Sequence, residues 1–130
     1  MAFTRGFHRY ACVGDEISCD VGEFQITARL MQDSCSHIDD DDCHNLKYVE
    51  DDQRDRVIAA RRAWKDDEWW YGGVVLSVSK NGVVLDDRAA ALWAIEVNYP
   101  GSDNSYLTVV ANDLIGEATE AGERTLERLA

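Results

Sequence analysis

The dipeptide Asn81-Gly82 stands between two runs of alternating apolar residues. It is the strongest short-range signal of a β-hairpin, because a type I′ turn needs positive φ at both central residues and these two residues tolerate it. A two-residue loop there would pair Lys80 with Val83 and Val78 with Leu85. We therefore predict a hairpin within the densest apolar stretch of the chain, 69–98.

The first arm of this hairpin divides its residues between two faces, because successive side chains of a strand point to opposite sides. One face carries Trp70, Val74, Leu76 and Val78, and the other carries Trp69, Tyr71, Val75, Ser77 and Ser79. Both sets are fairly apolar. The strand is therefore either covered on both sides or uses one face as an interface.

A further strand is predicted over 92–97, after a gap of three charged residues. We assign Trp93 and Ile95 to the core. Glu96 lies inside this apolar strand, and a buried carboxylate needs a partner or acquires a raised pKa. We expect the partner to be an arginine, either Arg61 or Arg62.

Towards the N-terminus the pattern predicts one clear strand and one short one. The stretch 24–30 alternates, with Phe24, Ile26, Ala28 and Leu30 directed inward. A short strand is predicted over 7–13, and 16–21 is ambiguous. From 33 to about 49 the periodicity disappears, and loops of this length in compact domains are usually functional or disordered.

Two helices complete the predicted fold. The first spans 50–65, with Asp51 and Asp52 in its first turn, where carboxylates oppose the positive end of the helix dipole. The second begins after Ser102 or Asp103, and its inward residues are Leu107, Val110, Ala111, Leu114 and Ala118. The order of elements predicts an α+β fold in one domain, 1–130, with an antiparallel sheet of about four to five strands and two helices packed on one face.

The charge balance excludes two classes of partner. Twenty-five acidic residues face thirteen Lys and Arg, a net charge of −12. Direct binding to nucleic acid or to an anionic membrane needs a basic surface. The acidity is instead consistent with a surface that imitates nucleic acid, with plain solubility, or with a compositional bias. Because the chain shows neither a signal peptide nor an apolar run of ~20 residues, we expect a cytoplasmic protein.

Four metal-ligand side chains lie within ten residues of one another: Cys35, His37, Cys43 and His44. Thiolates and imidazoles suit zinc, but adjacent ligands are hard to aim at one ion and the spacing matches no usual zinc motif. The run Asp39 to Asp42 lacks the glycine of a calcium loop. No nucleophile motif surrounds a serine or cysteine. We therefore expect no cofactor, no metal and no enzymatic activity.

The segments DEWWYGGVVLSVS, LWAIEVNYPGSDNSYL and VANDL resemble small uncharacterised proteins of bacteriophages, plasmids and other mobile elements. Those proteins carry an aromatic-rich D-E-W-x-Y-x-G-V-V strand, an L-W-x-I-E strand and a closing Y-L-x-x-V-A-x-x-L helix. The resemblance covers about Phe24 to Ala118. It implies an accessory role in a mobile element and no known chemistry.

The sequence thus predicts a non-enzymatic acidic factor that binds a host protein with a basic surface, such as a restriction or CRISPR protein. The candidate contacts are the acidic face of the last helix and the acidic side chains of one earlier segment: Asp39, Asp40, Asp41, Asp42, Glu50, Asp51, Asp52 and Asp55. One alternative is a structural or regulatory homodimer that uses an open sheet face. A second alternative is a small metal-dependent enzyme that uses the Cys/His loop.

Overall fold

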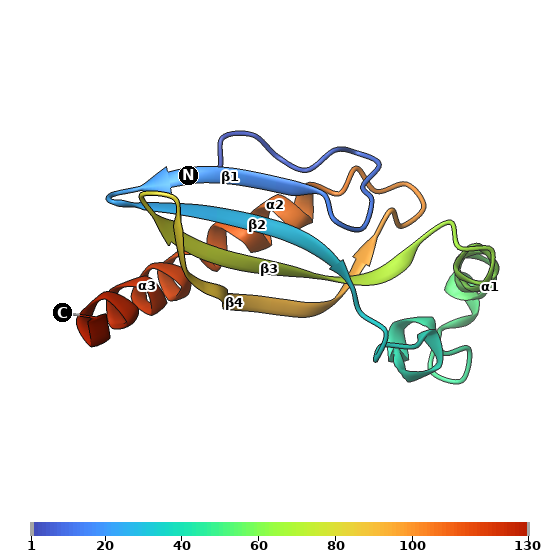
Figure 1. Ribbon diagram of the computed structural model, residues 1–130. Coiled ribbons are helices and arrows are strands. Elements are labelled where there is room, and N and C mark those ends of the chain that lie inside the picture. Colours follow the sequence, from blue (N-terminus) through green and yellow to red (C-terminus); the bar gives the residue numbers. More distant parts are fainter. Residues whose placement is uncertain (1, 130) are drawn as a thin grey trace.

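The computed structural model describes residues 2–129, which form a four-stranded antiparallel sheet with helices on one face (Figure 1). The strands are β1 (Glu16–Val21), β2 (Phe24–Gln32), β3 (Trp70–Lys80) and β4 (Val83–Val97), in the spatial order β1-β2-β3-β4. Two helices, α2 (Ser105–Asp113) and α3 (Ile115–Leu129), pack against this sheet. The predicted α+β class is confirmed.

Both packing helices come from the segment that was predicted as one final helix. The helix is interrupted at Leu114. From there α3 runs diagonally behind the sheet, towards the end of the sheet that lies away from α1 (Arg54–Lys65) (Figure 1). The other predicted helix is present as α1, preceded by a short 3-10 turn, but it lies beyond one end of the sheet. Between residues 2 and 129, no helix combines the length and apolar character that crossing a bilayer requires.

The central hairpin forms where it was predicted. Asn81 has φ 53° and Gly82 has φ 79°, as a type I′ turn requires, and Lys80 pairs with Val83. The predicted pairing of Val78 with Leu85 is wrong, because β4 carries one extra residue at this point. Val78 pairs with Asp86 instead.

The core fills the space between the sheet and the helices α2 and α3. The inward residues predicted for β2 are all buried, and so are Val74, Leu76 and Val78 of β3. The backbone of Gly122 in α3 lies so close to the sheet that an added Cβ would stand 2.9 Å from a methyl carbon of Val78. A glycine at this helix position therefore allows close packing of helix on sheet.

The strand β4 is longer and less regular than predicted. Residues 86–88, which were expected to separate two strands, are part of β4. The pairing of β4 with β3 is nevertheless irregular here, with a register shift between Leu76 and Val78 of β3. β4 is also an edge strand, and irregular, charged edges discourage pairing with another chain. The residues Asp86, Asp87 and Arg88 supply that charge.

A second irregularity in β4 separates two residues that were both assigned to the core. Ala94 has φ 61°, and the pairing with β3 shifts between Gly72 and Val74. As a result Ile95 lies in the core, whereas Trp93 stands on the opposite face with 39% of its surface exposed. There the Trp93 ring covers Gly73, where any Cβ would overlap it. The prediction that Trp93 is core is wrong.

The predicted strand over 7–13 is also wrong, because side chains rather than a neighbouring strand bind this backbone. The amide of Phe7 donates to Thr108 Oγ1 in α2 at 3.1 Å. The amide of Ala11 donates to Asn98 Oδ1 and its carbonyl accepts from Asn98 Nδ2, both at 2.8 Å. The first strand is instead β1.

Two asparagines hold together the turn between β4 and α2. The Asn98 amide donates to Asn104 Oδ1 at 2.8 Å, and Asn104 Nδ2 donates to Asn98 Oδ1 at 2.7 Å. Asn104 is only 2% exposed and also donates to the carbonyl of Arg9. The pair therefore joins the end of the sheet, the start of α2 and the N-terminal segment.

The two glycines of α3 provide a matched test of this packing. Gly122→Ala should lower the free energy of unfolding, because the new methyl group meets Val78 and Phe24. At Gly116 no atom lies within 4 Å of the position that a new methyl group would take. Gly116→Ala should therefore raise the free energy of unfolding by up to about 1 kcal/mol, through helix propensity alone. Urea denaturation measures both. Equal effects of the two substitutions would contradict the close approach at Gly122.

Candidate functional site

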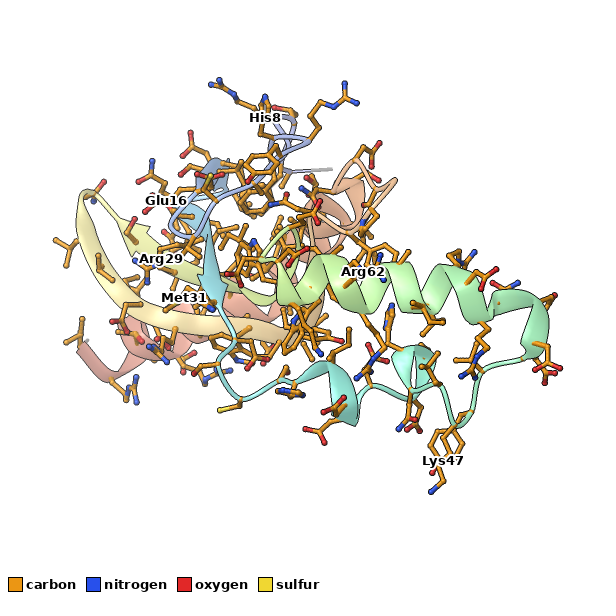
Figure 2. All side chains as sticks on the ribbon, turned by 90° about the vertical axis from the view of Figure 1, so that its right-hand side faces the viewer. His8, Glu16, Arg29, Met31, Lys47 and Arg62 are labelled. Carbon is orange, nitrogen blue, oxygen red and sulfur yellow. The ribbon has the colours of Figure 1, made fainter. Side chains whose placement is uncertain are left out.

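Residues 33–69 form a distinct lobe at one end of the sheet, which we call the end lobe (Figures 1 and 2). It contains α1 and the 3-10 turns η1 (Ile38–Asp40), η2 (Asp42–His44) and η3 (Asp51–Gln53). Figure 2 looks onto this end, with α1 in front, the loop beneath it and Lys47 at the outer bend.

The end lobe and the start of β3 share a small hydrophobic cluster that is separate from the main core. Its buried members are Ile38, Ala63, Trp69 and Tyr71. Trp69 is fully buried and its ring nitrogen donates to the carbonyl of Ala60 at 2.8 Å. This contact joins α1 to the start of β3. The loop after β2 is therefore ordered around an aromatic centre, although its sequence has no periodic pattern.

Asp33 connects the beginning of the lobe to the irregularity in β4. Its carboxylate accepts hydrogen bonds from the Cys35 amide at 3.0 Å, the Ser36 hydroxyl at 2.8 Å and the Ala94 amide at 2.9 Å. Desolvation raises the pKa of Asp33, but these hydrogen bonds outweigh it and lower the pKa below its usual value. The ionised form is the one that holds Ala94.

Three ionisable side chains cluster where the end lobe meets the sheet: Asp41 and His44 of the lobe and Glu96 of β4. His44 is 5% exposed. Its Nδ1 lies 2.9 Å from Asp41 Oδ2 and 3.5 Å from Glu96 Oε2. Its Nε2 lies 2.8 Å from the Tyr99 hydroxyl, and the Tyr71 hydroxyl donates to Asp41 Oδ2 at 2.8 Å. Two carboxylates thus meet one buried imidazole.

The two carboxylates of the cluster differ in their protonation behaviour. Desolvation raises the pKa of Asp41. Hydrogen bonds from Tyr71, His44 and the Cys43 amide have the opposite effect and outweigh it, so the pKa of Asp41 lies below its usual value. The pKa of Glu96 is raised, because burial outweighs the attraction of His44 and Asp41 adds repulsion. Burial and the bond to Asp41 also raise the pKa of Tyr71. The protein therefore stabilises the ionised form of Asp41 and disfavours the ionised form of Glu96.

A surface groove of about 610 Å³ opens over this cluster. Asp41, His44 and Glu96 line it together with Tyr99 and the guanidinium-bearing Arg56. The large exposed apolar side chains around it are Leu92, Trp93 and Tyr106. The two carboxylates of the cluster therefore face solvent through this groove.

The structure does not bring the predicted Cys/His quartet together. All four cysteines of the chain are free, and Cys35 and Cys43 are exposed. His37 packs its ring against Trp64 and accepts a hydrogen bond from the Asp39 amide. Among residues 2–129, the only close group of three or more His, Cys, Asp or Glu ligand atoms is Asp41, His44 and Glu96. Only His44 of the quartet belongs to it.

The predicted arginine partner of Glu96 is wrong. Arg61 donates instead to the carbonyl of His44 and to the carboxylate of Asp39, and Arg62 is exposed on α1. The side chain that faces Glu96 is His44, whose Nδ1 lies 3.5 Å from Glu96 Oε2. The i,i+3 spacing of Asp41 and His44 within a helical turn could have suggested that these two side chains meet, but nothing local connects them with Glu96.

The predicted acidic contacts fall into two groups. Asp41 points into the cluster, and Asp39 pairs with Arg61. The other six are exposed and, within the described residues, form no ion pair: Asp40, Asp42, Glu50, Asp51, Asp52 and Asp55. Six of the eight are therefore available to a partner.

Comparisons of the chain with protein-family models, with curated proteins and with solved structures give no match. We therefore interpret the site from its own residues and contacts.

Asp41→Asn should destabilise the protein at neutral pH by about 1–3 kcal/mol, because the Tyr71 and His44 hydrogen bonds lose their charged acceptor. A lowered folded-state pKa stabilises the native protein above the ordinary value of 3.8 and loses this effect as the pH falls through the folded value. The difference between parent and variant, measured by denaturant melts, should therefore shrink in acid. Asp42→Asn, at an exposed neighbour, should change little; an equal loss there would contradict the role of Asp41.

Glu96→Gln should behave in the opposite way. Because the folded-state pKa of Glu96 is raised, its ionisation costs stability as the pH rises from 4.5 through the folded value. The glutamine variant should therefore melt at a higher temperature than the parent at neutral pH and at a similar temperature near pH 4. Thermal melts over this range check the trend. A variant that is less stable at neutral pH would show that Glu96 is already compensated.

Proposed function

We propose that this chain is a non-enzymatic, acidic protein-binding factor that docks on a basic partner protein through its end lobe. The observation that carries the proposal is that six of the predicted carboxylates on that lobe are exposed and form no ion pair among the described residues. They project from a lobe that stands off the end of the sheet (Figures 1 and 2).

The charge of the lobe supports this proposal. Residues 33–68 contain twelve Asp and Glu against six Lys and Arg, a local net charge of −6 within a whole-chain charge of −12. At physiological salt the Debye length is ~8 Å, so clustered charges act together whereas distant ones are screened. Such a field steers a basic partner and sets the salt dependence of association.

A basic nucleic-acid-binding cleft of a host defence protein, such as a restriction or CRISPR protein, is the partner class we propose. It presents the complementary charge, and it agrees with the resemblance to mobile-element accessory proteins. The factor would then occupy a cleft that normally holds a phosphate backbone. It would inhibit by competition and would need no chemistry of its own.

One observation favours a homodimer as a second candidate. Among residues 2–129, no helix covers the face of the sheet opposite α2 and α3 (Figure 1). Trp93, whose ring lies over Gly73, stands partly exposed on that face. Exposed aromatic residues are enriched at protein interfaces. Light scattering of the parent protein distinguishes a dimer from a monomer before any partner is sought.

Two variants that remove equal charge test the docking proposal. The lobe variant replaces Asp40, Asp42, Asp51 and Asp52 by Asn. The helix variant replaces four exposed residues of α3 by Gln: Glu117, Glu120, Glu123 and Glu127. We expect the lobe variant to lose its partner in pull-downs from host lysate at physiological salt and to associate more slowly with the purified partner, with a flatter salt dependence.

The helix variant should capture the same partner as the parent protein. If both variants lose capture equally, total charge rather than the end lobe determines binding. If neither loses it, the acidic lobe only keeps the protein soluble. Unchanged thermal melts of both variants establish that any loss of capture is not a loss of folding.

A further inference from the structure

Asp41, His44 and Glu96 place three ligand atoms within 4.8 Å of one another, although Glu96 is separated from the other two by about fifty residues of sequence. Asp41 is the N-cap of the 3-10 turn η2, His44 is its last residue, and Glu96 lies on β4. From this geometry we propose that the cluster binds a divalent transition-metal ion such as Zn²⁺. The proposal goes beyond protein docking and is independent of it, since none of the six exposed carboxylates of the lobe is a ligand.

The spacing of the donor atoms fits one ion. Metal–ligand bonds of about 2.0–2.2 Å at near-tetrahedral angles put neighbouring donor atoms roughly 3–3.6 Å apart. His44 Nδ1 lies 2.9 Å from Asp41 Oδ2 and 3.5 Å from Glu96 Oε2. Both distances from His44 are close to this range, and all three ligand atoms lie within 4.8 Å of one another, so side-chain rotations could bring them around one ion.

The surroundings of His44 hold its ring in the orientation that such a site needs. A metal-bound histidine usually gives its second ring nitrogen to a fixed hydrogen-bond partner. Here Nε2 lies 2.8 Å from the Tyr99 hydroxyl, which leaves Nδ1 for the ion. The Trp69 and Tyr99 rings pack against the imidazole of His44. Arg61 donates a hydrogen bond to the backbone carbonyl of His44.

The Asp41 ligand is held in a similar way. Its Oδ2 accepts the Tyr71 hydroxyl and its Oδ1 accepts the Cys43 amide, so the carboxylate cannot turn freely. Tyr71, Trp69 and Tyr99 form one aromatic set beneath the ligands. Two of the three ligands are thus preorganised, and Glu96, with more than a third of its side chain exposed, is the one that closes on the ion.

The chemistry of the donors selects the class of metal. Mg²⁺ and Ca²⁺ prefer oxygen ligands only, whereas an imidazole with carboxylates suits Zn²⁺ and related transition metals. Two carboxylates and one neutral imidazole would neutralise a divalent charge. The groove above them leaves a further coordination position for water or a small anion beside Arg56.

The expectation of no metal concerned the quartet Cys35, His37, Cys43 and His44, and also calcium binding by Asp39 to Asp42, a run that includes Asp41. The donor set proposed here shares only His44 with that quartet. Because Asp41 and His44 belong to the loop and Glu96 belongs to β4, a bound ion would fasten the loop of the end lobe to the sheet.

The test uses full-length, metal-free protein with Cys35→Ser and Cys43→Ser, so that exposed thiols cannot bind the ion. Titration calorimetry with Zn²⁺ should show one site per chain, and Zn²⁺ should raise the melting temperature, whereas the same concentration of Mg²⁺ should not. Glu96→Gln in this background should weaken Zn²⁺ binding at least about tenfold, and Tyr99→Phe about 10–100-fold through loss of the histidine's partner. Asp42→Asn removes an exposed neighbouring carboxylate and should leave the affinity unchanged.

Glu96→Gln keeps the shape of the side chain, and its metal-free melting curve shows whether it folds. Absence of Zn²⁺ binding in the thiol-free background would overturn the proposal, and binding that appears only with Cys35 and Cys43 present would place the ion on the thiols. Binding that survives Glu96→Gln unchanged would also overturn it. If Glu96→Gln proves unfolded, Tyr99→Phe alone decides, because a purely structural role would leave the affinity of the folded variant unchanged.

Discussion

The hydrogen bond from the Ala94 amide to Asp33 Oδ2, 2.9 Å long, is the contact on which the arrangement of side chains between the end lobe and β4 depends. Ala94 adopts φ 61°, which is unfavourable for a residue with a Cβ, and its amide lies outside the regular ladder. The Asp33 carboxylate supplies the missing acceptor. With this irregularity in place, Ile95 enters the core while Trp93 faces outward, and Glu96 is directed to His44.

The parts of the fold that follow local rules could be predicted from the sequence. The turn at Asn81-Gly82 depends on the backbone preferences of two residues, and the inward set of β2 follows from strict alternation. The buried residues of α2 and α3 follow from helical spacing. The break at Leu114 has no proline beside it, and Gly116, two residues later, lies inside α3. Each of these features is determined by residues only a few positions apart.

The remaining features depend on contacts between distant residues, which periodicity cannot reveal. Trp93 was assigned to the core because alternation was extended through Ala94, but the strand is shifted there by Asp33, 61 residues earlier. The carboxylates of the acidic loop looked equivalent, yet Asp41 is drawn inward by Tyr71. The N-terminal segment resembled a strand because its own residues permit one, whereas Asn98 takes up the backbone groups of Ala11.

The pairing of neighbouring strands along the whole sheet has a consequence for the order of folding. In a sheet ordered β1-β2-β3-β4, the hairpins close short loops, and only the β2–β3 connection spans a long one. Short-range contacts form early because closing a short loop costs little chain entropy. The bond between Ala11 and Asn98 joins residues 87 positions apart. We therefore expect the β3–β4 hairpin to form early and the N-terminal segment to dock last, covering Asn104 only after the helices have closed the core.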